Sequence, residues 1–497
     1  MSANDPTRYW KNCTEREAAP ADDEFVNPPG EIEAQFGRRD FLKAAGFVFA
    51  GTMLSGCTRA PVEKAIPYLI QPEEIVPGRA SYYASTCAGC SAGCGLLVKT
   101  RDGRPVKLEG NPEHPWSSGG LCAVGQASLL GLYDSQRLNN PILNGRDATW
   151  EQVDRFVADD LSKARSAGAV RFLSGTVTSP TLRAAIARFL GGFKDARHVI
   201  YDPLSSSAIL EAHERTHGVR ALPGYRFDRA QTIVGLDADF LGTWISPVEF
   251  TRAYAAGRNA MVVPPCFSYH VQFESRLSLT GAKADRRVAI APGEAGSVLT
   301  ALSARVAKFA GAAFAAGDQS EGAISSQVLD ELASRLWQNR ARSLVVSGSQ
   351  DLDVQILCNF LNYLLGNYGR TLDLQSPSSQ KQGNDRELQA LIGELNAGKV
   401  AALFIQGVNP VYDLPDGEAL ARALERVPLV VSFAERQDET AAAARVVAPD
   451  HHPLESWGDA EAVAGTVSLL QPAVNPLGNT RSVLKSLAAW CSAPKNA

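Results

Sequence analysis

Cys87-Ala88-Gly89-Cys90-Ser91-Ala92-Gly93-Cys94, followed by a lone Cys122, is the stretch that decides how this chain folds. Four of its nine cysteines fall in this region, and the other five are scattered along 497 residues. Disulfide frameworks are typical of short, cysteine-dense chains. One tight group in a long chain therefore indicates a metal site.

The spacing of these cysteines predicts an iron–sulfur cluster. One tight loop can supply three thiolates, and the small residues between them let the backbone wrap around an inorganic core. A hairpin is expected before the fourth ligand, with strands over 95–100 and 105–110 and a turn between them. A structural zinc site is the alternative, although zinc sites usually pair two short Cys or His motifs. We predict one [4Fe–4S] cluster on Cys87, Cys90, Cys94 and Cys122.

The amino-terminal region has the pattern of an export signal. Arg38-Arg39-Asp40-Phe41-Leu42-Lys43 precedes an apolar stretch from Ala44 to Ser55, which is too short to span a membrane. This order of features is typical of twin-arginine signals, which export folded proteins. The stretch ends in Leu54-Ser55-Gly56-Cys57, which is either a lipobox or a chance cysteine. In the first case, lipid on Cys57 would anchor the protein to the periplasmic side of the inner membrane.

The composition is that of an ordinary soluble protein. Hydrophobic residues make up 45%, charged residues 21%, and the formal net charge is −4. This weak charge gives no attraction to nucleic acid, so we expect no nucleic-acid partner. No apolar run reaches the roughly 18 residues that a membrane-spanning helix needs.

Beyond position 145, short β-branched runs alternate with amphipathic helical stretches, which predicts parallel sheets covered on both faces. The expected fold class is α/β: a small cysteine-rich β domain followed by two doubly wound parallel-sheet domains. The predicted boundaries are a signal at 1–57, an extended linker at 58–82, the [4Fe–4S] domain at 83–144, and α/β domains at 145–285 and 286–497.

Ligands of doubly wound folds bind at the carboxyl ends of strands, where this chain has several glycine-rich loops. Such turns also occur in these folds without a ligand, so that interpretation stays open. His451 and His452 are adjacent on an extended segment and point in opposite directions, so we interpret them as structural. The candidate cofactor-binding residues, if a pterin is bound, are Gly175, Gly348, Gly407 and Asn409.

The cysteine pattern, Glu109-Gly110-Asn111-Pro112 and Gly119-Gly120-Leu121-Cys122 together resemble the amino-terminal cluster domain of the molybdopterin oxidoreductase family. The resemblance implies that Gly407-Val408-Asn409-Pro410 meets a pterin. Val124 stands near a position where many members have a lysine between cluster and pterin, so we expect molybdopterin to be doubtful here. Asp202 and Ser205 are the only candidates for a molybdenum ligand, with helix capping as their alternative role.

A narrower resemblance is to the molybdopterin-like half of the iron–sulfur B subunit of bacterial alternative complex III. It rests on the extended leader and on Tyr68 to Gly78, Asp239 to Val248 and Leu454 to Ala460. It implies an electron-transfer or structural subunit of a quinol-oxidising respiratory complex. The implied partners are a ferredoxin-like iron–sulfur subunit, a polytopic quinol-binding membrane subunit and a cytochrome c-type subunit.

Two other functions remain open. The chain could be a molybdopterin-dependent oxidoreductase of the polysulfide, formate or nitrate reductase type, or a scaffold without redox chemistry. The sequence leaves open whether the chain has molybdenum chemistry of its own. It also leaves open the electron acceptor, the cluster potential and the stoichiometry of the complex. Iron and molybdenum analysis of the purified protein separates the three functions.

Replacing Arg38 and Arg39 together by lysine should leave most of the protein in the cytoplasm, because the twin-arginine route depends on this pair. Cell fractionation with immunoblotting measures the distribution. Lysine keeps both positive charges, so unchanged periplasmic delivery would show that another route exports the chain.

Overall fold

The computed structural model describes residues 76, 78–261, 267–315 and 324–491. All of them belong to the unit Glu73–Ala497. The predicted export signal and most of the predicted linker lie outside the described residues. No helix in the described part of the chain is long and apolar enough to cross a membrane.

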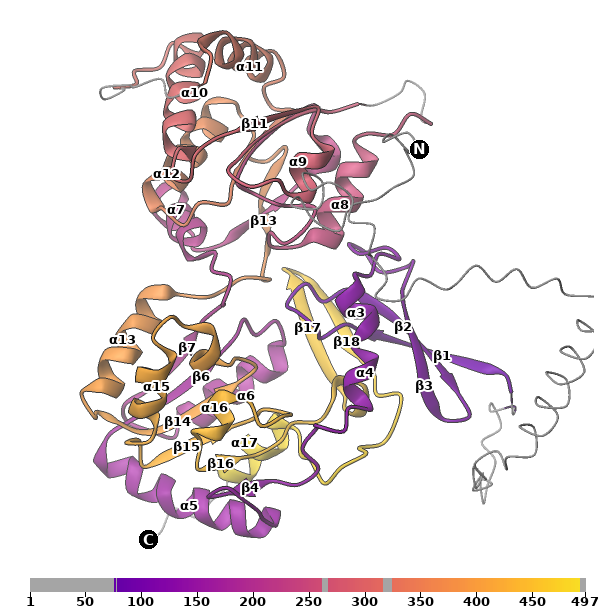
Figure 1. Ribbon diagram of the computed structural model, residues 1–497, viewed down its shortest axis with the longest axis vertical. Coiled ribbons are helices and arrows are strands. Elements are labelled where there is room, and N and C mark those ends of the chain that lie inside the picture. Colours follow the sequence, from indigo (N-terminus) through magenta and orange to yellow (C-terminus); the bar gives the residue numbers. More distant parts are fainter. Residues whose placement is uncertain (1–75, 77, 262–266, 316–323, 492–497) are drawn as a thin grey trace, which may run out of the picture. The chain divides into compact units, whose positions relative to one another are not determined.

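The cysteine-rich domain is built on a three-stranded antiparallel sheet in the order β1-β2-β3 (Figure 1). The predicted hairpin is confirmed, and Asp102 and Gly103 at its turn have φ of 50° and 77°. Positive φ at both central residues is what a tight two-residue hairpin turn requires. The elements of this domain are β1 (Ala80–Thr86), β2 (Gly95–Arg101), β3 (Arg104–Gly110), α3 (Ala123–Ala127) and α4 (Leu129–Leu132).

The largest sheet has the order β5-β4-β16-β15-β14-β6-β7, and its five strands from β16 to β7 are parallel. Residues alternate along β14, so that Ala402 and Phe404 join one buried core while Leu403 and Ile405 join another. Both faces of the sheet are therefore buried. The strands are β4 (Ile142–Leu143), β5 (Arg146–Asp147), β6 (Ala169–Ser174), β7 (Ala196–Ile200), β14 (Val400–Gln406), β15 (Leu429–Ser432) and β16 (Val446–Val447).

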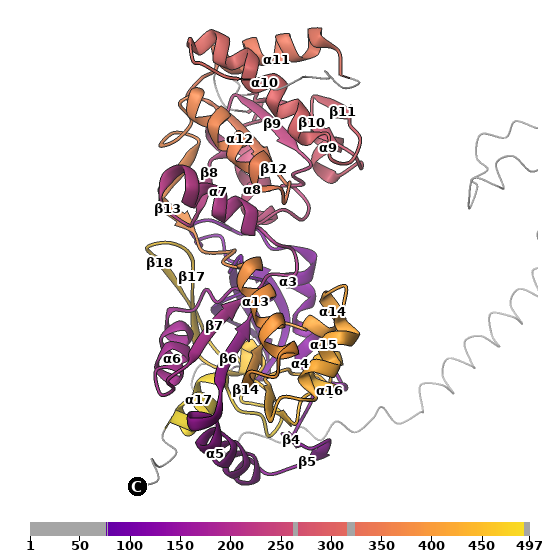
Figure 2. The ribbon, with the colours of Figure 1, turned by 90° about the vertical axis from the view of Figure 1, so that its left-hand side faces the viewer.

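Helices cover both faces of this sheet, and Figure 2 shows α6 and α17 on one side of its strands and α13 and α15 on the other. The helices on the first face are α5 (Trp150–Ala167), α6 (Pro180–Leu190) and α17 (Val483–Cys491). Those on or beside the second face are α13 (Asp385–Asn396), α14 (Pro410–Asp413), α15 (Gly417–Leu424) and α16 (Glu439–Ala442).

A second parallel sheet has the order β11-β10-β9-β12 and also has a buried core on each face. Its strands are β9 (Thr232–Leu236), β10 (Tyr269–Glu274), β11 (Arg286–Ala289) and β12 (Ser343–Ser347). Around it lie α7 (Ser207–His217), η1 (Phe227–Arg229), α8 (Pro247–Ala256), α9 (Leu279–Lys283), α10 (Ala295–Ala310), α11 (Ser326–Gln338) and α12 (Leu352–Leu364).

A fourth sheet, in the order β18-β17-β13-β8, is antiparallel and was not predicted. It joins strands that are far apart in sequence, because β8 follows α7 whereas β17 and β18 come near the carboxyl terminus. Its elements are β8 (Leu222–Tyr225), β13 (Leu372–Ser378), β17 (Gly458–Val463) and β18 (Thr466–Leu470), with η2 (Pro453–Glu455) just before β17.

The predicted α/β class with a small cysteine-rich β domain and two parallel-sheet domains is confirmed. The strand pairing does not follow the predicted division at 285/286. β10 pairs with β11 across that boundary, and β6 pairs with β14 more than 200 residues further along. The second sheet is therefore inserted into the first, so the sequential division at 285/286 was wrong.

Gly110 ends β3, where a Cβ atom would lie 2.2 Å from the carbonyl oxygen of Gly119. The clash is with backbone, so a side-chain rotation cannot relieve it. Gly110→Ala should lower the free energy of unfolding by about 1–3 kcal/mol, measured by urea denaturation. Gly393→Ala is the matched control, because nothing lies within 4 Å of that Cβ position in α13. It should be neutral or stabilising by about 0.5–1 kcal/mol. Equal stability of the two variants would contradict the prediction.

Candidate metal centre

The first three cysteines lie on one closed loop between paired strands. Cys87 follows the last residue of β1, Cys94 precedes the first residue of β2, and the amide of Cys87 donates to the carbonyl of Cys94 at 2.7 Å. Gly93 takes φ of 58°, a conformation open to glycine, at the point where the chain turns back. The antiparallel pairing of β1 with β2 therefore fixes both ends of the loop.

Cys122 approaches this loop from the start of α3, where it is the N-cap residue. Its sulfur accepts a hydrogen bond from the amide of Gly125 at 3.3 Å. A Cβ atom on Gly125 would lie 3.4 Å from the sulfur of Cys87, which places the turn of α3 directly against the loop. The Cys87 sulfur accepts from the amide of Gly89 at 3.4 Å. Backbone amides thus already point at two of the four sulfurs.

The four thiols differ in exposure. Cys87 and Cys94 are buried, whereas Cys90 and Cys122 are exposed. Burial, together with the charges of the neighbouring cysteines, raises the pKa of Cys87 to about 11 and that of Cys94 to about 12. Both are therefore protonated at neutral pH without a metal, and metal binding must release their protons.

The four cysteines supply the number of thiolates that a cubane cluster needs. No group of three or more His, Cys, Asp or Glu side chains within the described residues is close enough to hold one metal ion. Zinc needs all four ligands about 2.3 Å from one point, whereas each thiolate of a cubane binds a different iron. The four cysteines are near enough to one another that the charges of the other three raise the pKa of Cys94. Three cysteines on one closed loop, with the fourth at the start of α3, fit a [4Fe–4S] cluster.

Residues from outside the loop hold it in place. The indole nitrogen of Trp116 donates to the carbonyl of Ala92 at 3.1 Å. The hydroxyl of Ser91 donates to the carbonyl of Gln380, at 2.5 Å. Gln380 was missed in the sequence because it lies almost 300 residues from the loop. It stands in a polar run without any motif.

The candidate pterin-binding residues fall on two different sheets. Gly175 and Gly407 follow the neighbouring strands β6 and β14, and the amide of Gly175 donates to the carbonyl of Gln406 at 3.3 Å. Gly348 instead follows β12 in the second sheet, where its amide donates to Leu236. The amide group of Asn409 is occupied by Thr440 and Glu439. The structure therefore brings Gly175 and Gly407 together and leaves Gly348 elsewhere.

The two candidate molybdenum ligands are engaged within the protein. The carboxylate of Asp202 accepts from the hydroxyl of Thr176 at 2.8 Å and from the amide of Gly383 at 2.9 Å. The hydroxyl of Ser205 donates to Asp385 at 2.7 Å. Neither side chain is free to bind a metal in this conformation, so they do not fit that role and we derive no step through molybdenum.

The adjacent histidines point to different partners, in agreement with their structural interpretation. His451 shares a hydrogen bond with the hydroxyl of Thr480 at 2.7 Å. His452 contacts the carbonyl of Ser128 at 3.3 Å and accepts from the amide of Leu454. Burial is the main cause that lowers the pKa of both rings.

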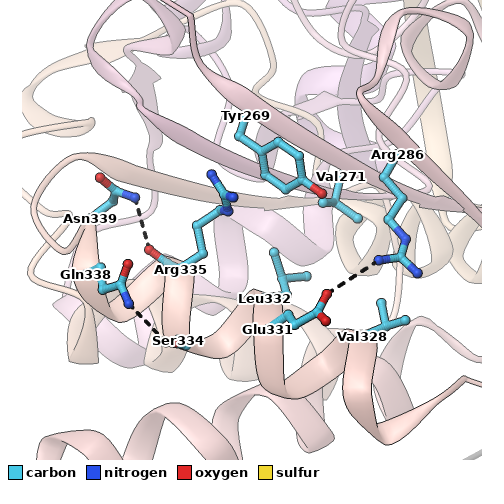
Figure 3. Close-up of a pocket in the computed structure, with 10 residues that line it drawn as sticks. All are labelled: Tyr269, Val271, Arg286, Val328, Glu331, Leu332, Ser334, Arg335, Gln338 and Asn339. Carbon is cyan, nitrogen blue, oxygen red and sulfur yellow. Dashed lines mark hydrogen bonds and ion pairs between the residues drawn. The ribbon is translucent and has the colours of Figure 1, made fainter.

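A cavity of about 400 Å³ lies between α11 and the first residues of β10 and β11 (Figure 3). The charged side chains that line it already have partners within the protein. Arg286 lies 3.9 Å from Glu331, and Arg335 lies over the ring of Tyr269 at 4.1 Å. It also lies at the amino ends of the strands, opposite to where ligands of such sheets bind. We assign it no function.

Comparisons with known proteins agree with this geometry. Residues 80–134 match the family model described as molybdopterin oxidoreductase Fe4S4 domain, and residues 287–491 match the model described as molybdopterin oxidoreductase. The chain is 26% identical to the molybdopterin-binding-like subunit of menaquinone reductase from Nitratidesulfovibrio vulgaris, over 91% of this chain and 71% of that protein. A nitrate reductase of Klebsiella oxytoca is 24% identical over 77% of this chain, which spans only 51% of that enzyme.

The fold is also found in a solved structure. Acetylene hydratase from Pelobacter acetylenicus aligns with a TM-score of 0.65 and 13% identity, covering 82% of this chain and 69% of that one. The match to the molybdopterin oxidoreductase model gives no support to the expectation that molybdopterin is doubtful. The chain therefore contains an Fe4S4 domain and a molybdopterin domain of the molybdopterin oxidoreductase family, with one parallel sheet inserted into the other.

Proposed function

We propose that this chain binds one [4Fe–4S] cluster and serves as an electron-transfer subunit of a quinol-oxidising respiratory complex of the alternative complex III type. The observation that carries the proposal is the closed loop of three cysteines with Cys122 beside it at the start of α3. Similarity to a menaquinone reductase subunit over 91% of the chain supports the link to quinones. The ligands are Cys87, Cys90, Cys94 and Cys122.

The bound cluster would supply one-electron transfer. The chain's own groups set its surroundings: the amides of Gly89 and Gly125 donate to cysteine sulfurs and favour their charged form. Buried Cys87 and Cys94 exclude water from one side, and exposed Cys90 and Cys122 face outward. Electrons can therefore be exchanged through the exposed side with a partner protein.

The proposed setting is the periplasmic side of the inner membrane, reached by twin-arginine export. The proposed partners are a polytopic quinol-binding subunit, a ferredoxin-like iron–sulfur subunit and a cytochrome c-type subunit. Support comes from the resemblance of the leader to a twin-arginine signal and from the relative whose name places it in a menaquinone reductase.

A second candidate is a molybdopterin-dependent oxidoreductase of the polysulfide, formate or nitrate reductase type. The observation in its favour is the match of residues 287–491 to the molybdopterin oxidoreductase model, together with matches to nitrate reductases. The occupied side chains of Asp202 and Ser205 are the observation against it.

Cys90→Ser should lower the iron content and bleach the broad visible absorption of the purified protein, because the exposed Cys90 is one of four ligands. Cys491→Ser is the matched control, since Cys491 packs at the end of α17 against a different core. Iron is measured by plasma emission spectrometry on both variants. Full iron retention in Cys90→Ser would refute the ligand assignment.

Purification from solubilised membranes should yield the chain together with polytopic and haem-containing partners, and with about four iron atoms per chain. Mass spectrometry of the eluate identifies the partners, and metal analysis is done on the same sample. A soluble monomer that contains stoichiometric molybdenum and reduces a small substrate would establish the second candidate instead.

A further inference from the structure

Glu249 in α8 is connected to the cysteine loop through a single residue. Its carboxylate accepts hydrogen bonds from the hydroxyl of Ser246 at 2.9 Å and from the side-chain amide of Gln380 at 3.3 Å. Gln380 is fully buried, and its main-chain carbonyl accepts from Ser91 between the second and third cysteines. A carboxylate is thus held in a fixed position behind the loop.

The start of α8 also contacts the other side of the cysteine set. Val248 packs in the same core as Cys87 and Cys94, and a Cβ atom on Gly120 would lie 2.7 Å from it. The charge of Glu249 reaches Cys94, where it is one of the causes that raise the thiol pKa, after burial and the other cysteines. Glu249 therefore lies within electrostatic reach of the buried side of the site.

Glu249 also lines a cavity of about 450 Å³ together with Trp116, whose indole nitrogen bonds the loop. The charged residues facing this cavity are Arg226, Asp228, Arg252 and Asp373. Arg226 is paired with Asp228 at 2.9 Å, so it is not free to neutralise Glu249 fully. A cavity of this volume, lined by several charged side chains, has room for water molecules beside the carboxylate.

The surroundings of Glu249 favour a carboxylate that can change its protonation state. Burial raises its pKa above the usual range, although hydrogen bonds from Ser246 and Gln380 and the charge of Arg226 act the other way. The side-chain oxygen of Gln380 is buried and has no hydrogen-bond partner among the described residues. An ionised Glu249 accepts from the nitrogen of this amide, and a protonated one can donate to its oxygen after the amide turns.

We propose that Glu249 is the proton acceptor of a redox-linked site, so that one proton enters from the cavity when one electron enters the cluster. In this step the oxidised cluster gains an electron from a quinol-linked partner, or from dithionite in a test. An O–H bond forms on the carboxylate as an O–H bond of a water molecule in the cavity breaks, and the hydroxide left behind passes to the solvent. The added negative charge raises the proton affinity of Glu249, and by reciprocity the proton makes reduction easier.

The test is a redox titration of the purified, cluster-loaded protein, followed by electron paramagnetic resonance at several pH values. In the parent protein the midpoint potential should fall as pH rises, approaching 59 mV per pH unit where the coupling is complete, which is a tenfold change per proton for one electron. Glu249→Gln keeps the shape and removes the charge. It should raise the potential at high pH and flatten the pH dependence.

Glu113→Gln is the control, because it removes one carboxylate from an exposed position in the cysteine-rich domain. Its potentials should follow those of the parent protein. Glu249→Asp retains a carboxylate, so a sloping profile should persist. A parent potential that does not vary with pH, or an unchanged slope in Glu249→Gln, would overturn the proposal. This inference rests on the proposed function for the cluster, and a parent protein without iron would refute both.

Discussion

The pairing of β6 with β14 is the constraint on which the rest of this structure depends. Residues 169–174 lie beside residues 400–406, so one parallel sheet is assembled from segments that are more than 200 residues apart in the chain. Phe172 and Phe404 stack across this pair at 6.2 Å and are both fully buried. The whole second sheet is inserted between these strands, and the loops of Gly175 and Gly407 become neighbours only because the strands pair.

The cysteine-rich domain likewise depends on contacts with residues that are remote in sequence. The hairpin of β17 and β18 returns to β1, where the hydroxyls of Ser85 and Thr86 donate to the carbonyls of Gln471 and Leu469 at 3.1 and 2.9 Å. A buried ion pair between Arg137 and Glu455, with a contact of 2.8 Å, joins the same two regions. Removing one partner of such a pair is costly because the other is left charged and buried. The loop that carries Cys87 therefore rests on residues near the carboxyl terminus.

The sequence predicts those parts of the fold that depend on residues close together in the chain. The hairpin of β2 and β3, the alternation of strands and helices and the four cysteines all followed from short patterns. The short antiparallel strand β8 was missed, because it contains a proline and a glycine and its partner β13 is remote in sequence. The division at 285/286 failed for a related reason. Alternating strands and helices predict parallel sheets, but the pattern does not tell which strand pairs with which.

The site shows the same difference between local and remote information. The cysteine spacing predicted a metal site, but nothing near Glu249 or Gln380 in the sequence points to the loop that they support. Their position gives the site two unlike sides. On one side Cys90 and Cys122 are exposed beside Val124, which is 67% exposed. On the other, Cys94 is buried within reach of a carboxylate. Electrons can then pass through the exposed side to a partner while charge is balanced from the buried side. Electron transfer and proton uptake therefore use different surfaces of the site.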